Sequence, residues 1–325
     1  MSGRPADNQA LVQTLNTQLL ALDRAYGPDA IARDFIQALD RTLQTYKGDV
    51  SGAALRAELL ALHDVLLDCR PRMASLIRDL QSIILFTVER PQASLDELCH
   101  YLHELLVIKD LRRSSLGQLA ARLFGRPAAL LLHSYGDLLA EILREAARQA
   151  ERPRVFVAEQ DPERTGPLIR FLREAGYEFT VVSEYSVTHV VPELGLAIFS
   201  ALTMNAREQV VLGPGSAGLV ANLHDARVPT YVTLTTNKLS FWEEHTEPAF
   251  RELRQKEYDG GPLRKEVFSH DVVPLDLFTA VITEYEILPP PQMRETYERL
   301  RQQFFEDEAR LRALHASLPG GSRDG

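Results

Sequence analysis

The sequence predicts an α/β protein in which an N-terminal helical domain precedes a domain built on a parallel β-sheet. Up to about residue 125, apolar residues recur at every third or fourth position. This spacing lines one face of a helix. From residue 126 onward, short apolar segments of strand length alternate with helical stretches. That alternation is typical of right-handed β–α–β units on a parallel sheet. A chain of 325 residues is long enough for two such domains.

The predicted helical domain spans residues 1–125. Its apolar stripes lie in residues 11–22, 31–39 and 55–66. Ser94 is followed three positions later by Glu97. This is the spacing of a capping box, so a helix is expected to begin there and to run to about residue 109. Nothing in this region carries chemistry, and it is interpreted as a packing module.

The predicted sheet domain spans residues 126–318 and ends before a tail, residues 319–325, that is expected to be disordered. A charged stretch at residues 243–267 is predicted to form a loop or a surface helix. A charged helix is predicted at residues 295–316. The remaining expectations are strands at 128–132, 154–158, 179–182, 196–199 and 230–234, and helices at 138–150, 168–175 and 217–226.

The charge of the chain argues against one class of partner. The formal net charge is −9, whereas non-specific nucleic-acid binding needs a basic surface. One group of basic residues leaves two readings open, a local basic face or a solvated helix face. The group consists of Lys109, Arg112, Arg113 and Arg122.

The cysteines and the apolar runs bear on location. Cys69 and Cys99 are the only cysteines, and they form neither a disulfide framework nor a metal-ligand spacing. This usage fits a reducing cytoplasm. The first ten residues are polar, so no signal peptide is expected. No apolar run approaches the ~20 residues that span a bilayer. The sequence therefore predicts a cytoplasmic protein with no membrane contact, no metal and no cofactor.

Polar residues follow several of the predicted strands. Because parallel strands end at the same edge of a sheet, these residues are expected to surround one crevice, where ligands of such sheets bind. They are His133 and Ser134, Glu159 to Asp161, Ser183 and Glu184, and Ser200 to Leu202.

Six sequence blocks in a fixed order resemble one known family. They are Leu131–Tyr135, Val157–Pro162, Thr180–Val187, Val211–Ser216, Val228–Val232 with Lys238, and a closing segment, Asp271–Pro289. Together they are similar to the initiation-factor-2B alpha/beta/delta family, which includes ribose-1,5-bisphosphate and methylthioribose-1-phosphate isomerases. The resemblance implies a Rossmann-like sheet domain of the NagB/RpiA/CoA-transferase kind. It also implies a homodimer formed through that domain.

The resemblance also implies where an isomerase would hold its acid and base, and this chain departs there. The family's catalytic cysteine matches Ser134, and its aspartate matches Leu202. Leucine cannot titrate, and serine needs a dedicated base. The family's Asn-Lys pair matches Leu212 and Gly213. The arginine that grips a phosphate matches Asp161, which would repel a phosphate. We therefore expect a non-catalytic binding or regulatory protein.

Several residues still point to binding of a phosphorylated small molecule, either a sugar phosphate or a nucleotide. Gly213, Gly215 and Ser216 precede a predicted helix, whose N-terminus attracts anions. The alternative is a plain turn with Ser216 as the N-cap. Lys238 would add a cation, or it is a solvated surface lysine. Asp161 completes this predicted ligand set.

The alternative function is an isomerase with a relocated acid/base set. His133 is either a ligand contact or a buried, satisfied histidine. Glu159 and Glu184, with Asp161, would hold a sugar hydroxyl, a ligand that carries a cation or a metal, or they form a solvated acidic cluster. For catalysis by His133 with Glu159 or Glu184, the carboxylates must converge within about 3 Å of one substrate position.

Overall fold

A computed structural model describes residues 28–45, 52–69, 73–124, 129–133, 136–148, 152–160, 162–242, 251–258 and 261–317. The apolar stripe expected at residues 11–22 and the tail at 319–325 lie outside these ranges, as do Ser134, Tyr135 and Asp161. Within the described ranges, no helix is both long and apolar enough to cross a membrane.

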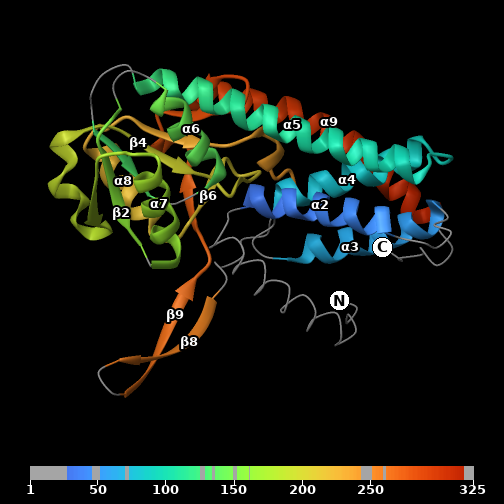
Figure 1. The fold of residues 1–325 in the computed structure, drawn as a ribbon, viewed down its shortest axis with the longest axis horizontal. Helices are drawn as coiled ribbons and strands as arrows, with labels where there is room; N and C mark the ends of the chain where they lie inside the picture. The colour runs from blue at the N-terminus through green and yellow to red at the C-terminus, as the bar shows by residue number, and fades with distance from the viewer. Residues whose placement is uncertain are drawn as a thin grey trace.

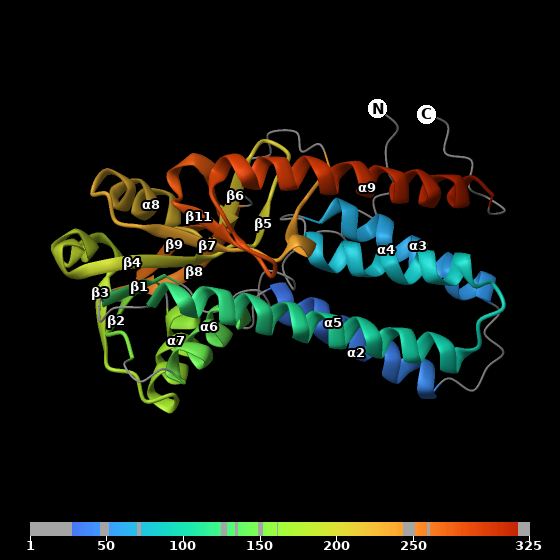
Figure 2. The same ribbon diagram turned by 90° about the horizontal axis from the view of Figure 1, so that it is seen from above.

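The helical domain is a bundle to which the last helix of the chain also belongs. Four helices come from the N-terminal half: α2 (Pro28–Thr45), α3 (Gly52–Asp68), α4 (Ala74–Glu89) and α5 (Leu95–Ala121). Figure 2 shows α9 (Pro290–Ser317) along one side of the bundle and α5 along the other. The aromatic ring of Phe304 on α9 packs 5.0 Å from that of Trp242 and so helps to hold α9 in place.

The capping box predicted at Ser94 is confirmed, but the helix that it begins is longer than expected. Ser94 Oγ accepts from Glu97 N at 3.2 Å, and Glu97 Oε2 accepts from Ser94 N at 2.8 Å. The helix continues to Ala121 because its second half packs against the sheet domain, where Leu116 and Ala120 are fully buried. α5 is therefore shared by both domains.

The sheet domain holds a seven-stranded sheet in the order β12-β11-β7-β4-β1-β2-β3. Six strands are parallel, and β12 runs antiparallel to β11 at one edge. The closing segment supplies the last two strands, which extend the sheet that the sequence predicted. The strands are β1 (Ala129–Leu132), β2 (Val155–Glu159), β3 (Phe179–Ser183), β4 (Leu194–Ser200), β7 (Thr230–Thr233), β11 (Ala280–Ile282) and β12 (Ile287–Leu288).

Both faces of this sheet are buried, and successive residues serve different cores. In β1, Leu131 belongs to the core shared with the helical bundle, whereas Leu130 and Leu132 belong to a second core. The second core is closed by α6 (Asp137–Ala147) and α7 (Pro162–Glu174). This alternation with a period of two residues is the geometry of a strand covered on both sides.

A smaller antiparallel sheet lies beside α8 (Ser216–Asp225). It consists of β5 (Thr203–Met204), β6 (Gln209–Leu212) and β10 (Asp271–Pro274), in the order β10-β6-β5. Asp271 pairs with Leu212 at the end of β6. This register brings the start of the closing segment next to the turn that leads into α8.

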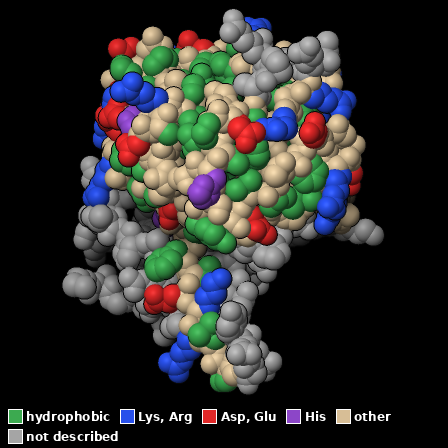
Figure 3. Space-filling view, turned by 90° about the vertical axis from the view of Figure 1, so that its left-hand side faces the viewer, with side chains coloured by type: hydrophobic (Ala, Val, Ile, Leu, Met, Phe, Trp, Pro, Cys, Tyr) green, Lys and Arg blue, Asp and Glu red, His purple; other side chains and the backbone are tan. Residues whose placement is uncertain are grey.

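The prediction for residues 243–267 was wrong where the structure describes them. In place of a loop or a surface helix, β8 (Arg251–Tyr258) and β9 (Gly261–Phe268) form a hairpin that pairs only with itself among the described strands. The hairpin projects from the body of the protein (Figures 1 and 3). Exposed charged residues of β9 hide the strand pattern in the sequence. Its single β-branched residue, Val267, is partly buried.

The core of the large sheet gives a first prediction. Ile198→Ala on the central strand β4, where Ile198 is fully buried, should lower the free energy of unfolding by about 2–5 kcal/mol through the cavity that it leaves. Val181→Ala on the edge strand β3 is the control, since Val181 is 38% exposed, and it should cost clearly less. Urea denaturation measures both, and equal losses would contradict the assignment of the core.

Candidate functional site

His133 lies at the carboxyl end of the sheet, where the sequence predicts a crevice. It follows β1 directly, and its side chain is 1% exposed. Its Nε2 lies 3.3 Å from Glu184 Oε2, and its Nδ1 lies 3.2 Å from Ser216 Oγ. The ring also packs against Phe199, at 5.4 Å between centroids. Three segments far apart in the sequence therefore meet at one imidazole.

The hydrogen bonds of this cluster are continuous. Ser216 Oγ donates to Gly213 O at 2.7 Å and also lies within hydrogen-bond distance of His133 Nδ1. Glu184 Oε2 lies within hydrogen-bond distance of Nε2, so both ring nitrogens have a partner within the protein. Of the two readings of His133 left open by the sequence, these contacts are those of a buried histidine satisfied by the protein itself.

Two carboxylates of the protein occupy the N-terminus of α8. Asp271 Oδ2 accepts from Ala217 N at 2.9 Å. Glu184 lies over Gly215, where a Cβ would meet Glu184 Oε1 at 2.2 Å. Gly215 also has φ +93°, and it is the N-cap of α8. The expectation that Ser216 is the N-cap was wrong, because Ser216 already lies inside the helix. The positive end of the helix dipole is thus compensated internally.

Lys238 is neither a surface lysine nor a free cation. Its side chain is among the largest fully buried ones, and its Nζ donates to Ala201 O at 2.9 Å. Its own carbonyl accepts from Thr203 Oγ1 at 2.6 Å. Lys238 therefore ties the loop after β7 to the end of β4. The expectation of a solvated surface lysine was wrong because the end of β4 and the start of β5 fold over it.

The other predicted residues do not converge. Glu159 ends β2 and is exposed, while Gln160 turns inward and donates from Nε2 to Pro214 O at 2.8 Å. Leu202 lies in the connection between β4 and β5 and bonds through its backbone to Val211 O. Ser134 and Asp161 lie outside the described residues. Only Glu184, of the two candidate carboxylates, reaches His133. Among the described residues, no group of three or more His, Cys, Asp or Glu has the geometry to hold a metal.

A basic pocket that the sequence reading left unresolved lies where the helical bundle meets the sheet domain. Its cavity is about 40 Å³, and about 10–15 Å³ holds one water, so a small oxyanion would fit. Four basic and two acidic side chains line it, which gives the lining a net charge of 4 − 2 = +2. The charged lining is Arg33, Lys109, Arg112, Arg113, Asp110 and Asp137, and Thr235 and Asn237 after β7 complete it.

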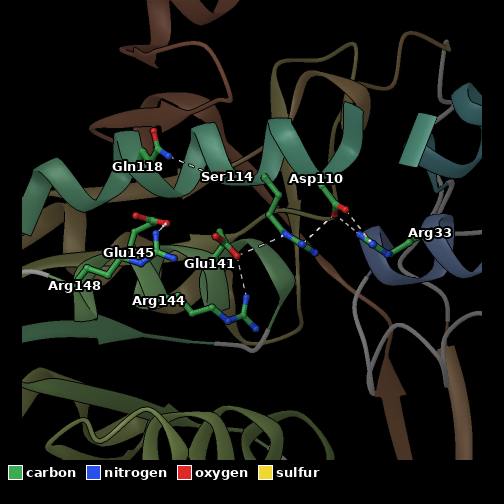
Figure 4. Close-up of polar contacts among 9 residues, drawn as sticks. Arg33, Asp110, Ser114, Gln118, Glu141, Arg144, Glu145 and Arg148 are labelled. Atoms are coloured by element: carbon green, nitrogen blue, oxygen red, sulfur yellow. Dashed lines mark hydrogen bonds and ion pairs between the residues drawn. The ribbon is translucent and has the colours of Figure 1, made fainter. Parts of the chain in front are cut away.

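Ion pairs hold the arginines of this pocket in place. Asp110 pairs with both Arg33 of α2 and Arg113, and Arg113 Nε lies 3.8 Å from Glu141 Oε2 of α6. Figure 4 shows the side chains of Asp110 and Arg33 directed at each other. The pairing of Arg112 is the loosest, with its Nε 3.7 Å from Glu284 Oε1, beyond hydrogen-bond length. Lys109, Arg112 and Arg113 therefore line a pocket and are only partly solvated, whereas Arg122, the fourth member of the group, is exposed and does not line it.

A buried polar network forms the floor next to the pocket. Asp79 of α4 lies 2.5 Å from Lys109 Nζ and accepts from Asn237 Nδ2 at 2.9 Å. Burial raises the pKa of the Asp79 carboxyl even though Lys109 opposes this. Arg78 donates to Thr236 O at 2.7 Å, and burial lowers the pKa of its guanidinium to about 10. These contacts join α4 and α5 to the loop after β7.

Glu284 is hydrogen-bonded to the same loop. Its carboxylate accepts from Thr236 N at 2.9 Å and from Thr236 Oγ1 at 2.6 Å. The backbone group that Glu284 binds belongs to the loop after β7 and not to its own closing segment. Glu284 is buried and has a structural role in these contacts.

Comparison with known proteins shows which family this chain matches. Residues 24–290 match the model of the initiation factor 2 subunit family. A putative translation initiation factor eIF-2B subunit 2-like protein of Pyrococcus furiosus is 24% identical over 246 residues, which cover 75% of this chain and 86% of that protein. A ribose 1,5-bisphosphate isomerase of Archaeoglobus fulgidus is 23% identical over 258 residues, which cover 77% and 82%.

Solved structures share the fold. The translation initiation factor eIF-2B of Pyrococcus horikoshii superposes with a TM-score of 0.70 at 22% identity, over 89% of this chain and 98% of that one. The tetrameric eIF2B-β2δ2 complex of Chaetomium thermophilum gives a TM-score of 0.64 at 15% identity, over 90% and 95%. Relatives of this fold thus include both translation factors and an isomerase, and some assemble into oligomers.

The contact between Glu184 and Gly215 gives a second prediction. Gly215→Ala should destabilise the protein by about 1–3 kcal/mol, because a side chain at φ +93° is strained and would displace Glu184. Gly218→Ala, one turn further along α8 with nothing within 4 Å of the added Cβ, is the matched control. It should stabilise by about 0.5–1 kcal/mol through helix propensity. Thermal unfolding of both variants decides, and a neutral Gly215→Ala would refute the contact.

Proposed function

The chain belongs to the initiation factor 2 subunit family, and we propose that it is a non-catalytic, homodimeric member that binds a phosphorylated small molecule. The observation that carries the proposal is the basic pocket between the bundle and the sheet domain. The relatives' names support a member of either kind, a translation factor or a sugar-phosphate isomerase. Free thiols at Cys69 and Cys99 fit the reducing cytoplasm in which we place the protein.

The phosphate group is assigned to the basic pocket. Arginine presents several donors in one plane and binds phosphate in a bidentate manner. Arg112 has the loosest internal pairing and so is the residue best able to turn toward a ligand. The pocket also borders the first turn of α6, which begins at Asp137.

The Gly213–Ser216 turn is the weaker candidate for the phosphate. Gly213, Gly215 and Ser216, with Lys238 and Asp161, were the ligand set expected from the sequence. Glu184 and Asp271 already lie at the start of α8. An outside anion would have to displace Glu184 from His133, at a cost in like-charge repulsion. The amine of Lys238 is bonded to Ala201 O. We therefore assign this turn a structural role and no contact with the phosphate.

The absence of catalysis is proposed from the positions that match the family's acid and base. Leu202 offers no proton, and its backbone is engaged with β6. His133 and Ser216 are each about 1% exposed. With the described residues in these positions, a substrate atom cannot contact either side chain directly. A general acid or base must come within hydrogen-bond reach of the reacting group.

One observation favours the alternative function of a sugar-1-phosphate aldose–ketose isomerase. Glu184, His133 and Ser216 form a continuous hydrogen-bonded chain of titratable and hydroxyl groups. Such a chain moves protons if an opening of the crevice admits the substrate. Glu159, exposed at the end of the neighbouring strand, would then be the second carboxylate.

Ligand binding is tested by thermal shift with inorganic phosphate, ribose 5-phosphate and adenosine monophosphate, with ribose as the unphosphorylated control. A phosphorylated ligand at a hundredfold excess over its Kd should stabilise the protein by about 2.7 kcal/mol. Arg112→Gln should raise the Kd about 10- to 100-fold, since a hydrogen bond to a charged group contributes about 1.5–3 kcal/mol.

Arg122→Gln is the matched control for that experiment. Arg122 immediately follows the same helix, is exposed and does not line the pocket. It should bind the ligand as the wild type does. Equal losses in both variants would mean that only the general charge of α5 matters. A shift that Glu184→Gln increases and Arg112→Gln leaves unchanged would move the phosphate to the turn before α8, because Glu184 repels an anion there.

Catalysis is tested separately by incubating the protein with ribose 1,5-bisphosphate or methylthioribose 1-phosphate. No ketose should form above the level of a boiled control. Turnover that is lost in His133→Asn and in Glu184→Gln, but retained in Glu193→Gln at an exposed position distant from the crevice, would establish the alternative function.

A further inference from the structure

The basic pocket has the room and the charge for one phosphate group. Its cavity of about 40 Å³ and its net lining charge of +2 match a phosphate monoester, which carries about −1.5 to −2 at pH 7. A second phosphate would find no comparable place at the N-terminus of α8, because Glu184 and Asp271 already lie there. These charges therefore favour a ligand with a single phosphate.

A tight turn at the carboxyl edge of the sheet carries an exposed tyrosine. The turn connects β11 to β12 and contains Tyr285. Thr283 N donates to Glu286 O at 3.0 Å, and Thr283 Oγ1 accepts from Tyr285 N at 3.2 Å and from Glu286 N at 3.1 Å. These hydrogen bonds hold the backbone of the turn, so the point from which the tyrosine side chain extends is fixed.

Glu284 places this turn next to the arginine to which we assign the phosphate. Its carboxylate accepts from Thr236, in the loop whose neighbouring residues line the pocket. The same carboxylate lies 3.7 Å from Arg112 Nε. Consecutive Cα atoms are about 3.8 Å apart. Tyr285, the next residue, is therefore anchored beside the pocket as well.

The two neighbours in the turn differ in exposure. Glu284 is 4% exposed, whereas Tyr285 is 66% exposed. On α5, the partly exposed Ile108 lies four residues before Arg112 and so on the same side of the helix. A flat apolar group that extends from a phosphate on Arg112 would thus find an aromatic ring and an aliphatic side chain next to the pocket.

We propose that the ligand is a nucleoside monophosphate, with its phosphate beside Arg112 and its base stacked on the ring of Tyr285. A base offers a flat π face that stacks on an aromatic side chain. A simple sugar phosphate offers mainly hydroxyl groups, which gain little from such a ring. The proposal rests on the phosphate site proposed above and names the class of ligand that occupies it. Arg112 then supplies affinity for phosphate, and Tyr285 determines specificity.

The first experiment compares the Kd values of adenosine monophosphate and ribose 5-phosphate by titration calorimetry. Wild-type protein should bind adenosine monophosphate at least about 5-fold more tightly, the lower end of what stacking on an aromatic ring contributes. Tyr285→Ala should remove this preference by weakening the nucleotide alone. Tyr285→Phe should keep it, because stacking does not need the hydroxyl group. A wild type without the preference would overturn the proposal.

Tyr185→Ala is the matched control. Tyr185 is 88% exposed and directly follows Glu184, next to the other candidate anion site. This variant should bind both ligands as the wild type does. If Tyr185→Ala weakens adenosine monophosphate and Tyr285→Ala does not, the base lies near the turn before α8 and the proposal is overturned. Circular dichroism and the midpoint of thermal unfolding without ligand confirm that each variant is folded.

The second experiment tests the single phosphate. Ribose 1,5-bisphosphate should bind no more tightly than ribose 5-phosphate, and tenfold tighter binding would reveal a second phosphate site and contradict the proposal. Adenosine should bind more weakly than adenosine monophosphate. The two proposals fail in different ways. If no phosphorylated ligand binds, the phosphate site itself is wrong. If ribose 5-phosphate and adenosine monophosphate bind equally and Tyr285→Ala changes neither Kd, only the stacking of a base on Tyr285 is wrong.

Discussion

The attachment of the helical bundle to the carboxyl edge of the sheet depends on one short loop after β7. Arg78 donates to the carbonyl of Thr236, Glu284 accepts from the backbone and hydroxyl of Thr236, and Asp79 accepts from Asn237. Lys238 ends the same loop and reaches the carbonyl of Ala201. Buried charges are tolerated only when they are paired and hydrogen-bonded. The loop, two helices and the closing segment therefore have to be in place together, and the basic pocket exists only when they are.

This interdependence explains why so much charge is buried at the junction. The pKa of Asp79 is raised and that of Arg78 falls to about 10, both chiefly because burial disfavours the charged forms. Such pairs contribute little net stability, yet removal of one member leaves the other uncompensated. They favour one relative position of the two domains over others. The binding of an oxyanion that we propose for the pocket would gain from that precision, because the arginines are positioned before the ligand arrives.

The sequence predicts the sheet but not the site. Strands such as β1, with four buried residues in succession, are recognisable because parallel strands covered on both faces form continuous apolar runs. The hairpin was missed because its backbone pairing needs no apolar pattern. Lys109, Arg112 and Arg113 have the same spacing whether they face solvent or a pocket, so only the position of α2 and of the loop after β7 distinguishes the two. The contact of Glu184 with Gly215 joins residues 31 positions apart (215 − 184 = 31), and no local rule predicts it.

The same contact bears on what this fold does with its helix N-terminus. In many α/β proteins the N-terminus of a helix beside the carboxyl edge receives an anionic ligand. Here Glu184 lies over Gly215 at that N-terminus, and Asp271 accepts from the backbone N–H of Ala217, two residues further on. The dipole is compensated and His133 is paired without any ligand. Folding of the crevice therefore does not depend on an outside anion, and a phosphate gains most where cations are less completely paired. By our proposal, that place is beside Arg112.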